Sequence, residues 1–291
     1  MQIINKTMDL KDLESEDAKN VIEELKELVE LYEKNNCQIS SWFGECVPAN
    51  DINRRLSIVN RGYNYKPILD NELDFKYPNF LLWEIFWVYS HLNLKKGDKV
   101  LDIGGSCSLF SFYLASKGVE VTAIDLNQGI VDEANRIAKI MNLNYKAECC
   151  DAEEYLSKTK GKFDFITSIC VFEHIELEKR KRIIKNIHKC LKKDGLIAFT
   201  FDYKNPSRFV NINTVEDIKD QFLCNKHLIM HENQEFYDNN INYLVSVFYG
   251  KPVIWYWKYR LIRDKEFPIW EFFRTKNYND YTFGSIFLKI K

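Results

Sequence analysis

Residues 99–108 read Lys-Val-Leu-Asp-Ile-Gly-Gly-Ser-Cys-Ser, a short apolar run that stops at two glycines. An apolar run bounded by glycine is typical of a buried strand in a parallel sheet. A glycine turn after a first strand lets a ligand approach the backbone closely, since glycine has no Cβ atom. The turn alone does not identify a ligand, because many α/β folds need such a bend.

Strand and helix patterns alternate on the carboxyl side of this stretch. Further strands are predicted at residues 119–127, 144–151, 163–171, 196–203 and 282–290. Helices are predicted between these strands at 109–118, 129–142 and 176–195, and ahead of the first strand at 16–33 and 79–92. Such alternation indicates βαβ units, a mostly parallel sheet and helices on both of its faces. The expected fold is therefore a doubly wound α/β fold.

Two segments do not follow the alternation. Residues 1–78 are predicted to form an N-terminal helical lid that takes part in substrate recognition, and residues 79–291 the main domain. An aromatic insertion is expected within the main domain at about 243–281. Its part 251–276 holds seven basic and three acidic residues among tryptophans and phenylalanines. This part has three readings: a substrate cap, a segment that contacts a membrane, or an arm that packs on the core.

Composition narrows the class of protein. The formal net charge of −1 lacks the basic surplus of most nucleic-acid binders, so no nucleic-acid partner is expected. The N-terminus is too polar for a signal peptide, and no apolar run reaches the ~18 residues that span a bilayer, which predicts a cytoplasmic protein. Eight cysteines without a C-x-x-C pair indicate reduced thiols and no metal site.

Asp125 ends the second predicted strand, about twenty residues after Gly104. An acid at this place can accept hydrogen bonds from both ribose hydroxyls of a nucleoside. The alternative is that Asp125 caps the helix that follows. A dinucleotide fingerprint would need glycine at positions 106 and 109, where Ser106 and Leu109 stand.

At these residues the chain resembles the class I S-adenosylmethionine-dependent methyltransferases, in particular small-molecule enzymes with a methyltransferase type 11/25-like domain. The resemblance runs from about Lys99 to Asp202. It rests on five motifs in order: VLDIGGSCS, AIDLN, CCDAEEY, FDFITSICVFEHI and LKKDGLIAFTF. The chain departs from the usual first motif at Ser106 and Ser108, where glycine is common.

The resemblance implies a seven-stranded Rossmann-like sheet whose last strand, 282–290, is antiparallel. It also implies S-adenosylmethionine as cofactor. The residues expected to bind the cofactor are Asp102, Gly104, Gly105, Ser106, Asp125, Leu126, Asp151, Ala152 and Ile169. His174 is the candidate catalytic base, with a structural Glu173-His174 pair as the alternative.

The fourth predicted strand ends in Ser168-Ile169-Cys170-Val171 and lacks the Asn/Asp-Pro-Pro-aromatic motif of many amino-group methyltransferases. This favours a small-molecule acceptor, methylated on an oxygen of a sugar or of a biosynthetic intermediate. Three alternatives stay open. They are a methyltransferase acting on lipid or protein, a non-catalytic cofactor-binding subunit of a larger assembly, and a nucleotide-sugar or dinucleotide oxidoreductase.

Overall fold

A single sheet forms the centre of the protein. The computed structural model describes residues 3–37, 44–48, 79–206, 212–247 and 280–291. The strands of this part of the chain are β1 (Lys6–Thr7), β2 (Gly44–Pro48), β3 (Lys99–Ile103), β4 (Glu120–Asp125), β5 (Tyr145–Cys149), β6 (Phe163–Ile169), β7 (Leu191–Tyr203), β8 (Leu228–Met230), β9 (Tyr243–Val247) and β10 (Asp280–Ile290).

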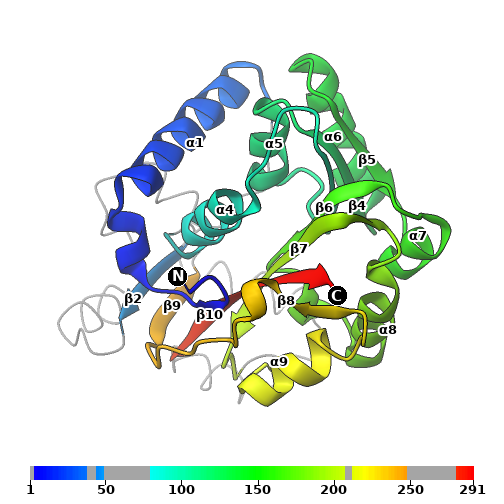
Figure 1. Cartoon of the computed structure of the whole chain (residues 1–291). Helices are drawn as coiled ribbons and strands as arrows, with labels where there is room; N and C mark the ends of the chain where they lie inside the picture. Colours follow the sequence, from blue (N-terminus) through cyan, green and yellow to red (C-terminus); the bar gives the residue numbers. More distant parts are fainter. Residues whose placement is uncertain (1–2, 38–43, 49–78, 207–211, 248–279) are drawn as a thin grey trace, which may run out of the picture.

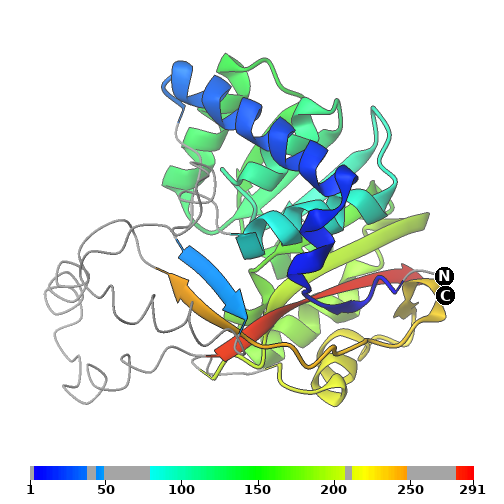
Figure 2. The same cartoon turned by 90° about the vertical axis from the view of Figure 1, so that its left-hand side faces the viewer.

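The strand order is β2-β9-β10-β7-β6-β3-β4-β5, and β1 and β8 pair with β10 beside this path. β3 to β7 run parallel to one another. β10 runs antiparallel to both β7 and β9, so β9 points the same way as β7. Figure 2 shows β2, β9 and β10 side by side at one end of the sheet. The doubly wound sheet and its antiparallel last strand are confirmed, and β1, β2 and β8 extend the expected seven strands.

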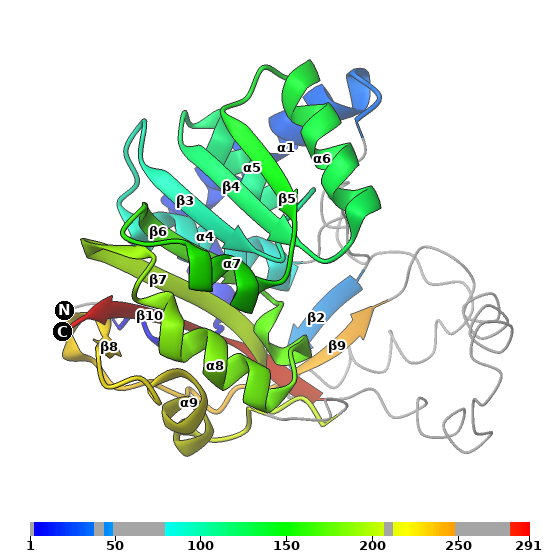
Figure 3. The same cartoon turned by 90° about the vertical axis from the view of Figure 1, so that its right-hand side faces the viewer.

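Helices cover both faces of the sheet. They are η1 (Leu10–Glu14), α1 (Glu16–Lys34), α4 (Asn79–Leu92), α5 (Leu109–Ser116), α6 (Gln128–Ile140), α7 (Ala152–Lys158), η3 (Phe172–His174), α8 (Leu177–Ile187), α9 (Val215–Phe222) and η4 (His231–Asn233). Figure 1 shows α1, α4, α5 and α6 on one side of the sheet and α7, α8 and α9 on the other. Figure 3 shows α7 and α8 over the face turned to the viewer.

The two faces give two hydrophobic cores. Successive residues of β3 point to opposite faces, so Val100 packs in the core under α4 and α5, and Leu101 packs under α8. Both residues are fully buried. Burial on both faces explains why the first strand reads as an unbroken apolar run instead of alternating with polar residues.

The described part of the N-terminal segment packs against the helices that cover one face of the sheet. Ser15 begins α1 by accepting a hydrogen bond from the Ala18 N–H at 3.2 Å. The apolar stripe of α1 is buried as its helical spacing predicts, and the ring centroid of Tyr32 lies 5.3 Å from that of Phe112 on α5. The lid function of residues 1–78 stays a prediction.

Two predicted boundaries were wrong. The helix predicted over 176–195 ends as α8 at Ile187, and Leu191 already pairs with Phe163 in the sheet. Gly195 allows this early start of β7, because an added Cβ atom would lie 2.6 Å from the carbonyl oxygen of Asp164. Glycine at this position therefore permits the close approach of β7 to β6.

The predicted insertion at 243–281 also begins differently. Residues 243–247 form β9, which pairs with β2 and β10 within the sheet. Residues 248–279 lie outside the described part of the chain, so the three readings of segment 251–276 stay predictions. Among the described helices, none combines the length and the apolar character needed to cross a membrane.

Candidate active site

The turn after β3 needs glycine at both Gly104 and Gly105. Gly104 has φ +76°, and a Cβ atom there would lie 2.6 Å from a methyl carbon of Val171. At Gly105 a Cβ atom would lie 1.8 Å from Oδ2 of Asp102. The turn is therefore packed against a side chain at each glycine, and its backbone is bare where it borders the cavity described below.

The buried carboxylate of Asp102 packs against this turn. The residue is 1% exposed, and its carboxylate accepts hydrogen bonds from the Ser111 hydroxyl at 2.5 Å and the Thr167 hydroxyl at 2.9 Å. Burial raises the pKa of Asp102 to about 6, and the charge of Asp125 acts in the same direction, while the two hydroxyls oppose the shift. Asp102 is thus a buried acid that fixes the turn.

Ser108 is one of the two serines that replace the usual glycines, and it has a local structural role. It is the N-cap of α5, and its hydroxyl accepts a hydrogen bond from the Ser111 N–H at 3.1 Å. Serine is among the preferred N-cap residues because it satisfies an amide at the start of the helix. This departure from the usual motif therefore strengthens the beginning of α5.

Asp125 ends β4 beside the turn, and the Gly104 N–H donates to the carbonyl of Ile124 at 2.8 Å. The helix-capping alternative for Asp125 is wrong. Asn127 is the N-cap of α6, and Asp125 Oδ1 accepts from the Asn127 N–H at 3.0 Å. The next residue, Leu126, is 72% exposed, which is unusual for a large apolar side chain beside a charged one.

One cavity of about 260 Å³ joins most of the predicted site residues. The predicted residues on its wall are Asp102, Gly104, Gly105, Ser106, Asp125, Ile169 and His174. Parallel strands end at one edge of a sheet, and the crevice at that edge is the usual ligand site of open α/β sheets. The cavity lies at this edge, where β3, β4 and β6 end.

Leu126, Asp151 and Ala152 are not part of this cavity wall. Asp151 caps α7, accepts from the Glu153 N–H at 2.9 Å and pairs with Lys179. Burial opposes ionisation of Asp151, but the Lys179 ammonium outweighs it and lowers the pKa of the carboxyl. Binding of the adenine amino group by Asp151 stays a prediction.

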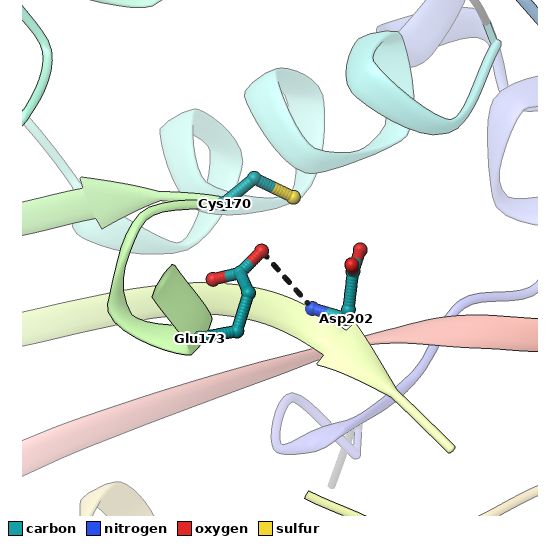
Figure 4. A group of neighbouring side chains, drawn as sticks. All are labelled: Cys170, Glu173 and Asp202. Atoms are coloured by element: carbon teal, nitrogen blue, oxygen red, sulfur yellow. Dashed lines mark hydrogen bonds between the residues drawn. The ribbon is translucent and has the colours of Figure 1, made fainter. Parts of the chain in front are cut away.

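Three acids and one thiol on the cavity wall were not singled out as site residues from the sequence: Glu84, Glu173, Asp202 and Cys170. Three of them are shown in Figure 4, where their side chains converge from the end of β6, from η3 and from β7. Cys170 resembles a small hydrophobe in its apolar run, and Glu84 is one acid within an apolar helix. A cue existed for Glu84, since an acid in a helix that is apolar on nearly all sides must be buried.

His174 ends η3 and reaches the same cavity, although its side chain is exposed. Its neighbour Glu173 is 5% exposed, and one carboxylate oxygen accepts from the Asp202 N–H at 3.4 Å. The two residues therefore differ in burial, and the alternative of a structural Glu173-His174 pair stays open. The role of His174 as a base stays a prediction.

Comparison with known proteins points to one family. The family described as "Methyltransferase domain" matches residues 100–195. A ubiquinone biosynthesis O-methyltransferase of Coxiella burnetii is 34% identical over 110 residues, which is 38% of this chain and 46% of that enzyme. A sphingolipid C9-methyltransferase of Candida albicans is 33% identical over 116 residues, which is 38% of this chain and 23% of that enzyme.

A ubiquinone biosynthesis O-methyltransferase of Azotobacter vinelandii is 26% identical over 126 residues, covering 43% of this chain and 52% of that enzyme. The chain thus spans about half the length, or less, of these curated relatives. The matched region holds the glycine turn, Asp125 and the end of β6. Residues 100–195 thus carry a methyltransferase domain, and these matches support a class I S-adenosylmethionine-dependent methyltransferase.

Proposed function

We propose that the chain transfers a methyl group from S-adenosylmethionine to an oxygen atom of a small-molecule acceptor. The observation that carries the proposal is the cavity that joins the bare turn at Gly104 and Gly105 to Asp125. A carboxylate at the end of β4 fits the ribose hydroxyls, and the exposed Leu126 offers an apolar surface next to it for a base. These residues fit a nucleoside cofactor.

When bound, S-adenosylmethionine supplies a methyl group already activated on a sulfonium. The chain then has to hold the acceptor in line with that methyl group and exclude water. Good alignment of reactants can lower the barrier by about 7–11 kcal/mol. In the proposal, His174 accepts the proton of the acceptor hydroxyl, because an imidazole changes charge near neutral pH.

An aromatic wall borders the cavity near the last strand. Phe80 of α4 stacks on Phe283 of β10, with ring centroids 4.5 Å apart and ring planes at 4°. The ring centroid of Tyr281 lies 5.4 Å from that of Phe283. Such a wall suits a planar or apolar part of an acceptor. The acceptor in this proposal is a biosynthetic intermediate or a sugar derivative, in a cytoplasmic reaction without a nucleic-acid partner.

The oxygen acceptor is supported by the names of two relatives, both O-methyltransferases of ubiquinone biosynthesis. The lipid alternative is supported by the sphingolipid C9-methyltransferase, although the chain matches only 23% of that enzyme. A transfer assay separates these classes. Purified chain is mixed with S-adenosylmethionine labelled in its methyl group and with separate small-molecule, lipid and protein fractions of a cell extract.

We expect label in the small-molecule fraction, as a methyl ether identifiable by NMR. Asp125→Ala should abolish the transfer at limiting cofactor, and Asp132→Ala, which removes an exposed acid of α6, should not. Label in the lipid or protein fraction would refute the acceptor class. Tight cofactor binding without transfer to any fraction would favour a non-catalytic subunit.

A further inference from the structure

A thiol and two carboxylates meet on the cavity wall near the ends of β6 and β7, whereas Asp125 ends β4. The ligand atoms of Cys170, Glu173 and Asp202 all lie within 4.8 Å of one another. Figure 4 shows the three side chains directed toward a common space, with Glu173 also bonded to the backbone of Asp202. Glu173 and Asp202 are 5% and 4% exposed, so this is not a solvated acidic surface.

Glu84 supplies a second, independent observation. Glu84 lies on α4 next to the cluster, on the wall of the same cavity, and is 0% exposed. The Cys170 thiol lies 2.8 Å from Glu84 Oε1, and Oε2 is buried without a hydrogen-bond partner among the described residues. A buried carboxylate oxygen without a partner is unfavourable, and a cation nearby would stabilise its charge.

We propose that Cys170, Glu173 and Asp202 bind a divalent transition-metal ion of the Zn²⁺ class, with Glu84 beside it. One thiolate with carboxylate oxygens is a donor set for Zn²⁺ or Co²⁺, whereas Mg²⁺ and Ca²⁺ favour oxygen ligands alone. Zn–S and Zn–O bonds of about 2.3 and 2.0–2.2 Å place ligand atoms roughly 3.5 Å apart in a tetrahedron. The side chains would have to close by about 1 Å to bind the ion.

Three protein ligands leave a fourth position open toward the cavity, as in many reactive zinc sites. Three strand spacings of about 4.8 Å separate β4 from β7, so the ion would lie roughly 14 Å from Asp125. If the proposed function holds, this is the acceptor end, and an acceptor hydroxyl bound to the ion would lose its proton more readily. The sequence predicted no metal site, because it holds no C-x-x-C pair.

The test uses Co²⁺ as a spectroscopic probe and Zn²⁺ as a competitor on the full chain. We expect one Co²⁺ per chain, a sulfur-to-cobalt charge-transfer band, and displacement of Co²⁺ by Zn²⁺. Cys170→Ser should remove the band, and Asp202→Asn should weaken binding at least tenfold. The matched controls are Cys149→Ser, which removes an exposed thiol, and Glu178→Gln, which removes an exposed acid; both should bind as the unaltered chain does.

Sub-stoichiometric binding, a band that survives Cys170→Ser, or a band lost in Cys149→Ser would overturn the proposal. X-ray absorption of the unaltered chain with Zn²⁺ decides the matter even if a variant does not fold. One sulfur among oxygen ligands agrees with the site, and no sulfur or two sulfurs contradicts it. S-adenosylhomocysteine binding on the same samples is a separate readout: its absence refutes the proposed function and leaves the metal result intact.

Discussion

Replacing Gly105 by alanine should damage the cofactor turn through one identifiable contact. The added Cβ atom would lie 1.8 Å from Oδ2 and 2.3 Å from Cγ of Asp102. Carbon and oxygen atoms do not approach within 3.0 Å in this way, so either the carboxylate or the turn must move by more than about 1 Å. Asp102 cannot move freely, because Ser111 and Thr167 hold its two oxygens.

The size of the expected loss in Gly105→Ala follows from those two hydrogen bonds. A hydrogen bond to a charged group contributes about 1.5–3 kcal/mol, so losing both costs about 3–6 kcal/mol. If the turn moves instead, a loss of about 3 kcal/mol in binding raises the Kd for S-adenosylhomocysteine by roughly 100-fold. We expect Gly105→Ala to lower the free energy of unfolding by at least about 3 kcal/mol, or to weaken binding on that scale.

Urea unfolding and calorimetric titration measure the two quantities on the same protein. Gly129→Ala is the matched control, because a Cβ atom there meets only Asn127 Oδ1 at 3.4 Å. This change in the first turn of α6 should alter stability by no more than about 1 kcal/mol. Gly105→Ala combined with Asp102→Ala should lose less than the two single changes added together. Unaltered stability and binding in Gly105→Ala, or strict additivity in the double variant, would refute the contact.

Three further predictions concern the same cavity. Because burial raises the pKa of Asp102 to about 6 in the folded chain, its contribution to stability is full below the reference value of 3.8 and is lost as the pH rises through 6. Urea unfolding at several pH values should therefore show that Asp102→Asn becomes more stable relative to the unaltered chain as the pH rises from 4 to 7, by up to about 3 kcal/mol. A difference in the free energy of unfolding that stays constant with pH would contradict this. Ser108→Ala should cost about 1 kcal/mol in the same assay and Ser108→Gly only a few tenths, since glycine is tolerated as an N-cap; equal costs would exclude capping. His174→Gln should lower kcat and remove the acidic limb of its pH profile, with S-adenosylhomocysteine affinity unchanged; an unchanged kcat would exclude His174 as the base.

Local patterns predicted the parts of the fold that are encoded within a few residues. β3 and β4 were recognisable because each is an apolar run that ends at a glycine or an acid. The helix over 79–92 was predicted with its observed bounds. These features depend on hydrogen bonds and burial that repeat along a single element.

Features that depend on distant partners could not be predicted in the same way. β9 is short, and its partners β2 and β10 come from far apart in the chain, so its pairing could not be predicted from the residues near Tyr243. The contact of Cys170 with Glu84 joins residues on β6's end and α4 that no local spacing relates. The sequence indicated the part of the cavity that follows β3 and β4. It did not indicate the part formed by Glu84, Cys170, Glu173 and Asp202.

Calorimetric titration with S-adenosylhomocysteine, with NADH as control, tests the central claim most directly. The unaltered chain and Asp132→Ala should bind S-adenosylhomocysteine alone, at micromolar concentration. Asp125→Ala should bind it at least about tenfold more weakly, because charge-assisted hydrogen bonds of about 1.5–3 kcal/mol each are lost. Binding of NADH in place of S-adenosylhomocysteine, or equal affinity in Asp125→Ala, would contradict the placement of the cofactor at the carboxyl end of β3 and β4.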